Sequence, residues 1–544
     1  MRLLLAATML ATAGLALAAP ATAQMKQRGT DASGDAINRI IDQGTNHSEV
    51  MPTIEYLTDV IGSRLTNSSG MRRAEAWTQA KFTGWGLKGV HKEAFAFGRG
   101  WQIERSSVRM TSPRPVQLVA IPIAWTPGTA GAISAPVVVA PMSRDADFAK
   151  WRGKLAGKIV MTSAPTPAKD PATPAFHRLS DEELAKLDEF QQPRNDPEAL
   201  DRRLARLDFA KHLDAFLKSE GALAYATMSG RDGKLVSGEG YLFGTGETQA
   251  LPGVQIAQED YLRLARLVTI GQAPVLEIDS QVRFDDGDAN AYNIIAEIPG
   301  SDPRAGYVMA GAHLDSWVAG DGAADNGAGS AMVMEAARIL AATGVRPKRT
   351  IRFALWAGEE QGILGSLAYV EQHLATRGSP SDPVQTGMKR YYGWANRWPV
   401  TPLPGHNQLA AYFNIDNGSG RLRGLYAERN PAAVPIFKEW LAPFKSMGAD
   451  TVVVRPTGST DHVFFQAVGV PGFQFIQDPL DYGSRVHHSS IDTFDHLKAD
   501  DLRQGSIVLA SVLLDAADAT QPLPRPPVPT RPAVTDPFGY QGDD

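Results

Sequence analysis

The sequence contains no cysteine among its 544 residues. Disulfide bonds are therefore excluded, although an exported protein could form them. Thiolate metal ligands and a lipid-modified cysteine at a mature N-terminus are excluded as well. The stability of the fold must come from a large hydrophobic core or from bound metal.

The sequence also lacks a strong excess of charge and two common hydrolase motifs. The formal net charge is −5 and the pI is near 6.2, which argues against a general binder of nucleic acids or anionic membranes. Neither HExxH nor GxSxG occurs. A zinc protease with helix-borne ligands and a serine hydrolase therefore have no direct support.

No second long apolar run follows the one at the N-terminus. Residues 1–23 contain one basic residue, Arg2, then an apolar run, then Ala21-Thr22-Ala23. This is the pattern of a secretory signal peptide, cleaved before Gln24. The run is short for a membrane-spanning helix, so a cleaved signal is favoured over a membrane anchor or a buried helix. We expect a periplasmic or secreted protein.

The length exceeds that of an ordinary single domain, and 43% hydrophobic with 21% charged residues is typical of a globular protein. From residue 292 onwards, strands alternate with helical segments. This predicts an α/β fold with a mostly parallel sheet flanked by helices. The predicted elements of this part span 292–299, 306–312, 326–344, 350–356, 362–378 and 408–416.

The remaining segments suggest further units. Two amphipathic helices are predicted between residues 47 and 85, and a smaller β-rich unit spans 115–280. The Pro-rich residues 521–540 are expected to form an extended, solvated end. The predicted organisation is a signal peptide (1–23), a discontinuous main domain (24–114 plus 281–520), an inserted domain (115–280) and a tail (521–544).

Polar side chains follow three predicted strands at the point where each strand ends. Because sites in open parallel sheets form at the carboxyl ends of strands, these side chains are expected to meet at one edge. They are His313 and Asp315, Glu359 and Glu360, and Asp416.

Two later groups extend this set. Asp325 lies just before a predicted helix, and His487, His488 and Asp492 lie together in VHHSSIDTFDH. Singly, such residues are often helix caps or solvated charges, but here they converge on consecutive strand ends. Imidazole and carboxylate ligands without a thiol suit zinc. More than four candidates indicates two ions that share a bridging carboxylate and activate one water.

Four motifs carry a family resemblance: GAHLDSWVAGDGAADNGAGS, LWAGEEQGILGS, FNIDNGSG and HHSSIDT. Together they resemble the co-catalytic zinc exopeptidase family, which includes bacterial leucyl aminopeptidases, glutamate carboxypeptidase II and the transferrin receptor. HLDSW and VRPKRTIRFALWAGEEQG are most similar to the plasma glutamate carboxypeptidase, or carboxypeptidase Q, branch. The resemblance covers residues 290–500 strongly and 45–110 weakly. It implies a zinc-exopeptidase fold.

The resemblance also implies two Zn²⁺ ions per chain and a role for each candidate residue. Asp315 would orient His313, as metal-bound histidines usually require, and Glu359 would be the general base. Because side chains of adjacent residues diverge, Glu360 can reach a metal while Glu359 faces the water. The implied ligands are His313 and Asp416 for one ion, Glu360 and His488 for the other, and Asp325 as the bridge.

The chain departs from the family at one position. The family often has a tyrosine directly before the last ligand, where it helps to stabilise the oxyanion, but here that residue is His487. The oxyanion donor is therefore open, and His487 is the favoured candidate because an imidazole can donate a hydrogen bond.

The inserted unit at 115–280 resembles a protease-associated domain, with GKIVMTSAP as its most recognisable text. In the family, this domain shapes or covers the active-site cleft. Candidate substrate-lining residues in the loop PTGSTDHVFF are Ser459, Asp461 and His462, although an ordinary capped turn explains them equally well.

The leading hypothesis is an exported zinc exopeptidase, an aminopeptidase or dipeptidase acting on peptides with free N-termini. One alternative is a catalytically inactive receptor-like binding protein, which the filled ligand positions disfavour. The other is a one-metal cyclase acting on N-terminal glutamine, which the complete two-metal motif disfavours. The sequence indicates no nucleic-acid partner and no membrane segment after signal cleavage. It leaves side-chain specificity and the oligomeric state open, with a dimer possible.

Overall fold

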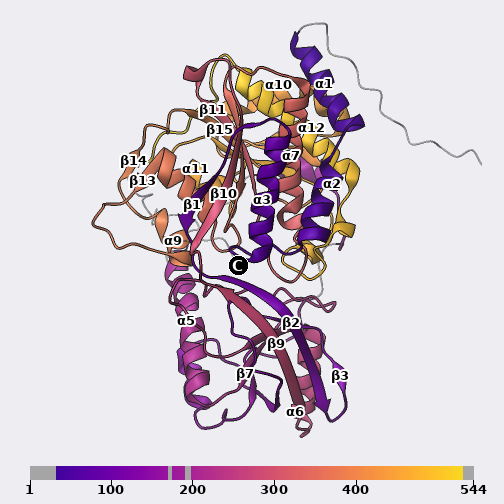
Figure 1. The fold of residues 1–544 in the computed structure, drawn as a ribbon, viewed down its shortest axis with the longest axis vertical. Coiled ribbons are helices and arrows are strands. Elements are labelled where there is room, and N and C mark those ends of the chain that lie inside the picture. Colours follow the sequence, from indigo (N-terminus) through magenta and orange to yellow (C-terminus); the bar gives the residue numbers. More distant parts are fainter. Residues whose placement is uncertain (1–31, 170–173, 190–195, 197, 531–544) are drawn as a thin grey trace, which may run out of the picture.

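The computed structural model describes residues 32–169, 174–189, 196 and 198–530. The predicted signal peptide and residues 531–544 of the predicted tail lie outside these ranges. Figure 1 shows two lobes: an upper one, in which helices flank a sheet, and a lower one built on a second sheet. Among the helices of the described ranges, none combines the length and the apolar character needed to cross a bilayer.

The first sheet has eight strands in the order β1-β10-β12-β11-β15-β18-β16-β17. Its four central strands, β12, β11, β15 and β18, run parallel. This confirms the predicted α/β class with flanking helices. The strand bounds are β1 Lys88–Ala96, β10 Asn290–Ile298, β11 Tyr307–His313, β12 Thr350–Trp356, β15 Leu409–Asn414, β16 Leu422–Tyr426, β17 Thr451–Val453 and β18 Gly472–Gln477.

The outer part of this sheet is mixed. Strand β10, which belongs to the predicted alternating series, pairs antiparallel with β12. Only residues 299–306 join β10 to β11, and a parallel crossover needs a dozen or more residues. The chain therefore reverses direction at this connection.

Helices cover both faces of the first sheet, so its central strands are buried on both sides. Along β11, Val308 and Ala310 enter one hydrophobic core, whereas Tyr307 and Met309 enter another. This explains the continuous apolar run of that strand. The helix bounds of this domain are α1 Ala32–Asn46, α2 Val50–Glu55, α3 Ser69–Gly84, α7 Ala328–Thr343, α8 Leu364–Tyr369, α9 Gly387–Trp394, α10 Val434–Leu441, α11 His462–Gln466 and α12 Ala499–Asp518.

One predicted helix is interrupted. The segment 362–378 forms α8, then a wider π-helical turn at Val370–Leu374, and ends in the short strand β13 (Ala375–Arg377). Strand β13 pairs antiparallel with β14 (Val400–Pro402). The helical pattern therefore predicted only the first part of this segment.

The second sheet also has eight strands, in the order β3-β2-β9-β5-β6-β7-β8-β4. Its long antiparallel pair β2 and β9 runs down the lower lobe (Figure 1) and carries the sheet beyond residues 115–280 at both ends. The bounds are β2 Gly100–Ser112, β3 Val116–Gln117, β4 Ala120–Pro122, β5 Ile133–Val139, β6 Ile159–Met161, β7 Ala224–Met228, β8 Gly253–Ile256 and β9 Val275–Asp285, with helices α4 Asp181–Lys186, α5 Ala199–Ser219 and α6 Gln258–Thr269.

A segment of the domain built on the second sheet, called the second domain below, docks on the edge of the first sheet. Arg178 forms ion pairs with Asp478 at 3.0 Å and with Asp501 at 2.9 Å. Leu184 packs with Val453 and Ile476. Both aspartates are buried and need cationic partners. Arg178 adds to Arg423 at Asp478 and to Arg421 at Asp501, and the contact fastens the two domains together.

The described part of the Pro-rich tail, residues 521–530, contains no helix or strand, but it is only partly solvated. Leu523 is buried, and Asn430 donates a hydrogen bond to the carbonyl of Pro524. Arg525 donates to the carbonyls of Leu409 (2.6 Å) and His406 (2.9 Å). The tail packs because its arginine satisfies carbonyl groups at the start of β15.

Candidate active site

The site lies where the parallel strands end. Strand β11 ends at His313 and lies between β12 and β15. Glu359 and Glu360 follow the end of β12, and Asp416 follows the end of β15. After β12, on one side of β11, the chain crosses to β15 on the other side, and ligands bind where the strand order reverses in this way.

Three acidic side chains surround the Nε2 atom of His313. This atom lies 3.4 Å from Asp416 Oδ1, 3.5 Å from Asp325 Oδ1 and 4.0 Å from Glu359 Oε2. The ligand atoms of His313, Asp325 and Asp416 are close enough to hold one metal ion. The structure thus brings together this predicted group.

A second group gathers on the other oxygen of Asp325. His488 Nε2 lies 3.3 Å from Asp325 Oδ2 and 2.9 Å from Glu360 Oε2. His487 Nε2 lies 3.7 Å from the same Asp325 oxygen. Each oxygen of Asp325 therefore faces a different cluster, which is the geometry expected of a bridging carboxylate.

The backbone around Asp325 is fixed by Asp492. The carboxylate of Asp492 accepts hydrogen bonds from the amides of Ala324 (2.6 Å) and Asp325 (3.1 Å). Asn326 donates to the carbonyl of Ile415, next to Asp416. These contacts hold Asp325 in an extended conformation just before α7.

Asp315 supports the site in two ways, one of which the sequence did not indicate. Its backbone carbonyl lies 3.0 Å from His313 Nδ1, whereas its carboxylate Oδ1 is 3.7 Å away. The carboxylate instead accepts the amides of Glu359 (3.3 Å) and Glu360 (3.2 Å) and the hydroxyl of Thr66 (3.1 Å). Asp315 therefore positions both neighbouring glutamates as well as the imidazole.

Arg64 is a supporting residue that the sequence analysis missed. Its fully buried guanidinium donates to the carbonyls of Leu314 (2.8 Å), Asp321 (2.6 Å) and Gly322 (2.7 Å). Burial lowers its pKa to about 10, although nearby aspartates oppose this. A lone arginine after a predicted helix gives no sequence signal for such a role.

Burial and crowding shift the acidity of the carboxyl groups. Burial raises the pKa of Glu359 well above its usual value, and Asp416 and Asp461 add to the effect while His313 opposes it. Burial raises the pKa of Glu360 to about 7, against the influence of His488. Such shifts are typical of functional sites.

The pKa values of Asp325 and His313 shift in opposite directions. Burial would raise the pKa of Asp325, but its bond to His313 and its proximity to His488 hold the pKa below the usual range. Burial would lower the pKa of His313, yet Asp416 and Glu359 raise it well above the usual value. The anionic cluster therefore favours positive charge at its centre.

The residues fit a pair of metal ions. Two oxygens of the site, Asp325 Oδ2 and Glu360 Oε1, are buried and make no hydrogen bond within the described residues, although His488 Nε2 lies 3.3 Å from the first. Buried carboxylate oxygens without donors are costly unless a cation coordinates them. One imidazole and two or three carboxylates around each position form a donor set that zinc accepts.

The site opens into a cavity of about 340 Å³, within the range of small-ligand pockets. Tyr391 and Tyr482, which the sequence analysis missed, lie on its wall together with His487 and Ser459. Tyr482 lies five residues before His487 and contacts its ring edge to face at 4.9 Å. The position directly before the last ligand, where the family often has a tyrosine, holds His487 here, but a tyrosine reaches the cavity from the preceding turn.

The three predicted substrate residues are placed differently from one another. Ser459 lines the cavity, whereas Asp461 and His462 are fully buried. His462 Nε2 lies 3.3 Å from Glu428 and 3.1 Å from Thr457. Burial raises the pKa of Asp461 to about 8. Asp461 and His462 therefore lie behind the cavity wall rather than on it.

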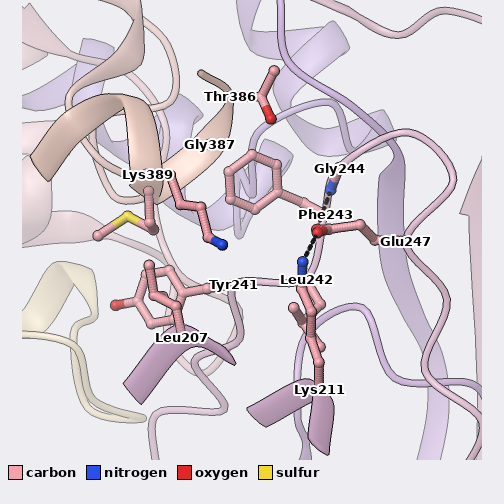
Figure 2. A pocket seen from close by; sticks show the side chains of 11 residues that line it. Leu207, Lys211, Tyr241, Leu242, Phe243, Gly244, Glu247, Thr386, Gly387 and Lys389 are labelled. Atoms are coloured by element: carbon pink, nitrogen blue, oxygen red, sulfur yellow. Dashed lines mark hydrogen bonds and ion pairs between the residues drawn. The ribbon is translucent and has the colours of Figure 1, made fainter. Parts of the chain in front are cut away.

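A separate cavity of about 130 Å³ lies between α5 and α9, at the boundary of the two domains. Figure 2 shows Glu247 turned towards Gly244 and Lys211, with Lys389 on the opposite side. Glu247 is the single carboxylate among the described residues that line it. This cavity therefore offers no set of metal ligands comparable with the one around Asp325.

Comparison with known proteins agrees with this geometry. The sequence profile of peptidase family M28 matches residues 293–513. The chain is similar to carboxypeptidase Q from Bos taurus, with 27% identity over 501 residues, 90% of this chain and 91% of the relative. It is also similar to leupeptin-inactivating enzyme 1 from Streptomyces exfoliatus, with 30% identity over 190 residues, 35% of this chain and 36% of the relative.

Solved structures share the fold. A peptidase M28 precursor from Shewanella amazonensis superposes with a TM-score of 0.64 at 22% identity and covers 92% of this chain and 99% of its own. A zinc aminopeptidase from Bacillus subtilis superposes with a TM-score of 0.52 at 19% identity and covers 85% and 93%. The matched region contains every residue of the two clusters, and the chain is a zinc metallo-exopeptidase whose residues 293–513 are similar to peptidase family M28.

Proposed function

We propose that the chain is an exported, zinc-dependent exopeptidase that holds two zinc ions per chain. His313 and Asp416 would hold one ion, Glu360 and His488 the other, and Asp325 would bridge them. The observation that carries this proposal is the division of Asp325, whose Oδ1 faces His313 and whose Oδ2 faces His488.

Each residue of the site then has a chemical task. When bound, the two ions activate a water molecule and polarise the scissile carbonyl. Glu359 lines the cavity beside Asp325, where it can take a proton from the water and pass it to the leaving amine. His487 and Tyr482 lie on the same wall and can donate hydrogen bonds to the developing oxyanion.

The two alternative functions fit the site less well. A receptor-like protein without activity does not require two filled ligand clusters with Glu359 on the wall of the same cavity. A one-metal cyclase does not require two ligand clusters that share Asp325. A zinc count on the purified protein distinguishes one ion from two.

We assign the second domain as a protease-associated domain that shapes the cleft, and the N-terminal 23 residues as a cleaved signal peptide. The contacts between residues 231–239 and the loop of His487 and His488 support the first assignment. The mature N-terminus should be near Gln24, and an intact Met1 on protein recovered from the periplasm or medium would contradict export.

The substrate is best sought among short peptides with free N-termini. The relatives' names include both aminopeptidase and carboxypeptidase, so both ends must be tested. The experiment compares free dipeptides, N-acetylated dipeptides, dipeptide amides and longer peptides in the presence of zinc. An aminopeptidase or dipeptidase should lose activity on N-acetylated substrates. Equal cleavage of acetylated peptides would indicate a carboxypeptidase, and no cleavage of any would refute the exopeptidase proposal.

A further inference from the structure

One carboxylate of the second domain reaches the metal site. Glu239 lies on the loop between β7 and β8, and its Oε1 atom lies 3.2 Å from Nδ1 of His488. Its other oxygen accepts a hydrogen bond from the hydroxyl of Tyr241 at 3.2 Å. Glu239 is far from His488 in the sequence, and none of the motifs that identify the family contains it.

The two nitrogens of His488 face different partners. Its Nε2 atom points at Asp325 and Glu360, so this is the nitrogen that a metal ion would bind. A neutral imidazole that binds a cation through Nε2 carries its proton on Nδ1. That proton points at the carboxylate of Glu239, and a charged acceptor there fixes the ring and makes its ligand nitrogen more basic.

The loop places Glu239 with little freedom. Its neighbours are both glycines pressed against the chain at residues 122–124. An added Cβ at Gly238 would lie 2.9 Å from the carbonyl oxygen of Pro122, and one at Gly240 would lie 2.2 Å from that of Ala124. Only glycine fits at such close backbone approaches. The two flanking glycines therefore fix the backbone position from which the carboxylate of Glu239 reaches His488.

Further contacts fasten the same loop to the histidine segment. Arg231 donates to the carbonyl of His487 at 2.5 Å. Ser490 donates its amide to the carbonyl of Val236 at 2.9 Å. The ring of Trp317 contacts both Tyr241 and His488 edge to face. The second domain therefore contacts the last ligand on several sides.

The other histidine is supported from within its own domain. His313 Nδ1 lies against the carbonyl of Asp315, in the same domain and two residues away. We propose that Glu239 is a positioning residue for His488, so that one of the two metal positions is completed across the domain boundary. This inference rests on the proposed two-zinc function.

The test is a calorimetric zinc titration of the metal-free, full-length protein. The wild type should bind two equivalents. Glu239→Ala should retain one equivalent with unchanged affinity and bind the other about 10–100-fold more weakly, the usual cost of removing such a partner. Glu239→Gln keeps the shape of the side chain but not its charge. Its affinity for the second equivalent of zinc should lie between those of the wild type and Glu239→Ala.

Glu247→Gln is the matched control. Glu247 lies on the same loop but turns towards Gly244 and Lys211 (Figure 2), so this variant should bind zinc like the wild type. Circular dichroism and thermal unfolding of the metal-free variants report on folding. If Glu239→Ala does not fold, the isosteric Glu239→Gln decides the question alone.

The outcomes separate the two proposals. Wild-type affinity at both positions in a folded Glu239→Ala variant would overturn the role of Glu239 and leave the two-zinc function intact. Equal weakening at both positions would also overturn it, because Glu239 would then only hold the domains together. Fewer than two equivalents in the wild type would refute the proposed function itself, and this inference with it.

Discussion

His313 and His488 lie on opposite sides of Asp325, and the chain supports them by different means. His313 is the last residue of β11, is almost fully buried, and has its Nδ1 atom against a carbonyl two residues away. His488 lies on a late loop with its side chain 23% exposed, and its Nδ1 atom faces Glu239 of the second domain.

The backbone differs as well. His313 has ordinary strand geometry, whereas His488 has a positive φ of 51°, a conformation that costs about 1–3 kcal/mol for a residue other than glycine. Strain of this kind persists only where the surrounding contacts hold it in place. The His313 position is thus formed within one domain, at the end of a strand, and the His488 position depends on contacts between domains.

The largest effect is expected where the two positions meet. Asp325→Asn removes the charge that both share, so both zinc ions should be lost and turnover should fall by more than about 10³-fold, since bound metals contribute several kcal/mol. Asp321→Asn, four residues earlier, is the control and should keep both ions. Zinc analysis and turnover on the two variants provide the check, and full zinc content in Asp325→Asn would contradict the bridge.

The two adjacent glutamates should separate chemistry from metal binding. Glu359→Gln should keep both zinc ions but lose about 10²–10⁴-fold in turnover, the usual contribution of a general base. Glu360→Gln should weaken zinc at the His488 position, because an amide is a poorer ligand. Metal content and turnover measured side by side decide between them. Metal loss in Glu359→Gln with retention in Glu360→Gln would reverse the assignment.

Asp315→Asn tests the His313 position as Glu239→Ala tests the other. Its carboxylate accepts three hydrogen bonds, including the amides of both glutamates. An asparagine has one acceptor oxygen, so a donor is left unsatisfied at a cost of about 1–3 kcal/mol. Calorimetry should show about 10–100-fold weaker zinc binding with a lower melting temperature. Unchanged binding would remove Asp315 from the site's support.

The pH dependence of the metal-free protein should report the crowded carboxyls. Burial raises the folded-state pKa of Glu360 to about 7 and that of Asp461 to about 8. The stability that their bound protons provide is complete below the unfolded-state pKa of about 4 and is lost as the pH rises through the folded-state values. The raised pKa of His313 acts in the same direction above its usual range.

The melting temperature of the metal-free protein should therefore fall between about pH 5 and pH 8. With zinc bound, the cations stabilise the ionised form of the ligand Glu360, so the decline should be smaller. Thermal unfolding in chelator and in zinc across this range makes the comparison. A metal-free melting temperature that rises over the same interval would contradict the assigned pKa directions.

The smallest effect is expected from Asp461→Asn. Because Asp461 is buried with its pKa raised to about 8, it is mostly uncharged at pH 7, and asparagine is nearly its isostere. Stability should change little, because the substitution removes no charge from the core at pH 7, and turnover and KM should stay within a few-fold. A large rise in KM would instead make Asp461 a substrate residue, as the loop sequence suggests.

The sequence marks the His313 position more clearly than the His488 position for a physical reason. His313, Glu359 and Asp416 follow strands whose apolar runs and order mark one edge of the sheet. The assignment of Asp325 and His488, by contrast, depends on the spacing of the family's motifs. Glu239, Tyr482 and Arg64 gave no usable signal, because their roles depend on contacts between residues far apart in the chain.

The fold, too, was predictable from local pattern only in part. Strand β12 matches its predicted bounds, because a buried strand between short turns has a clear apolar run. The antiparallel course of β10 and the packing of Arg525 were not predicted. Both follow from connection lengths and tertiary hydrogen bonds, which local pattern does not encode.

The most direct test of the two-position account is anomalous X-ray diffraction at the zinc edge on crystals of the zinc-loaded protein. The account predicts two peaks about 3.5–4 Å apart, one beside His313 and Asp416, the other beside Glu360 and His488, with Asp325 between them. A single peak, or peaks that Asp325 does not join, would contradict it.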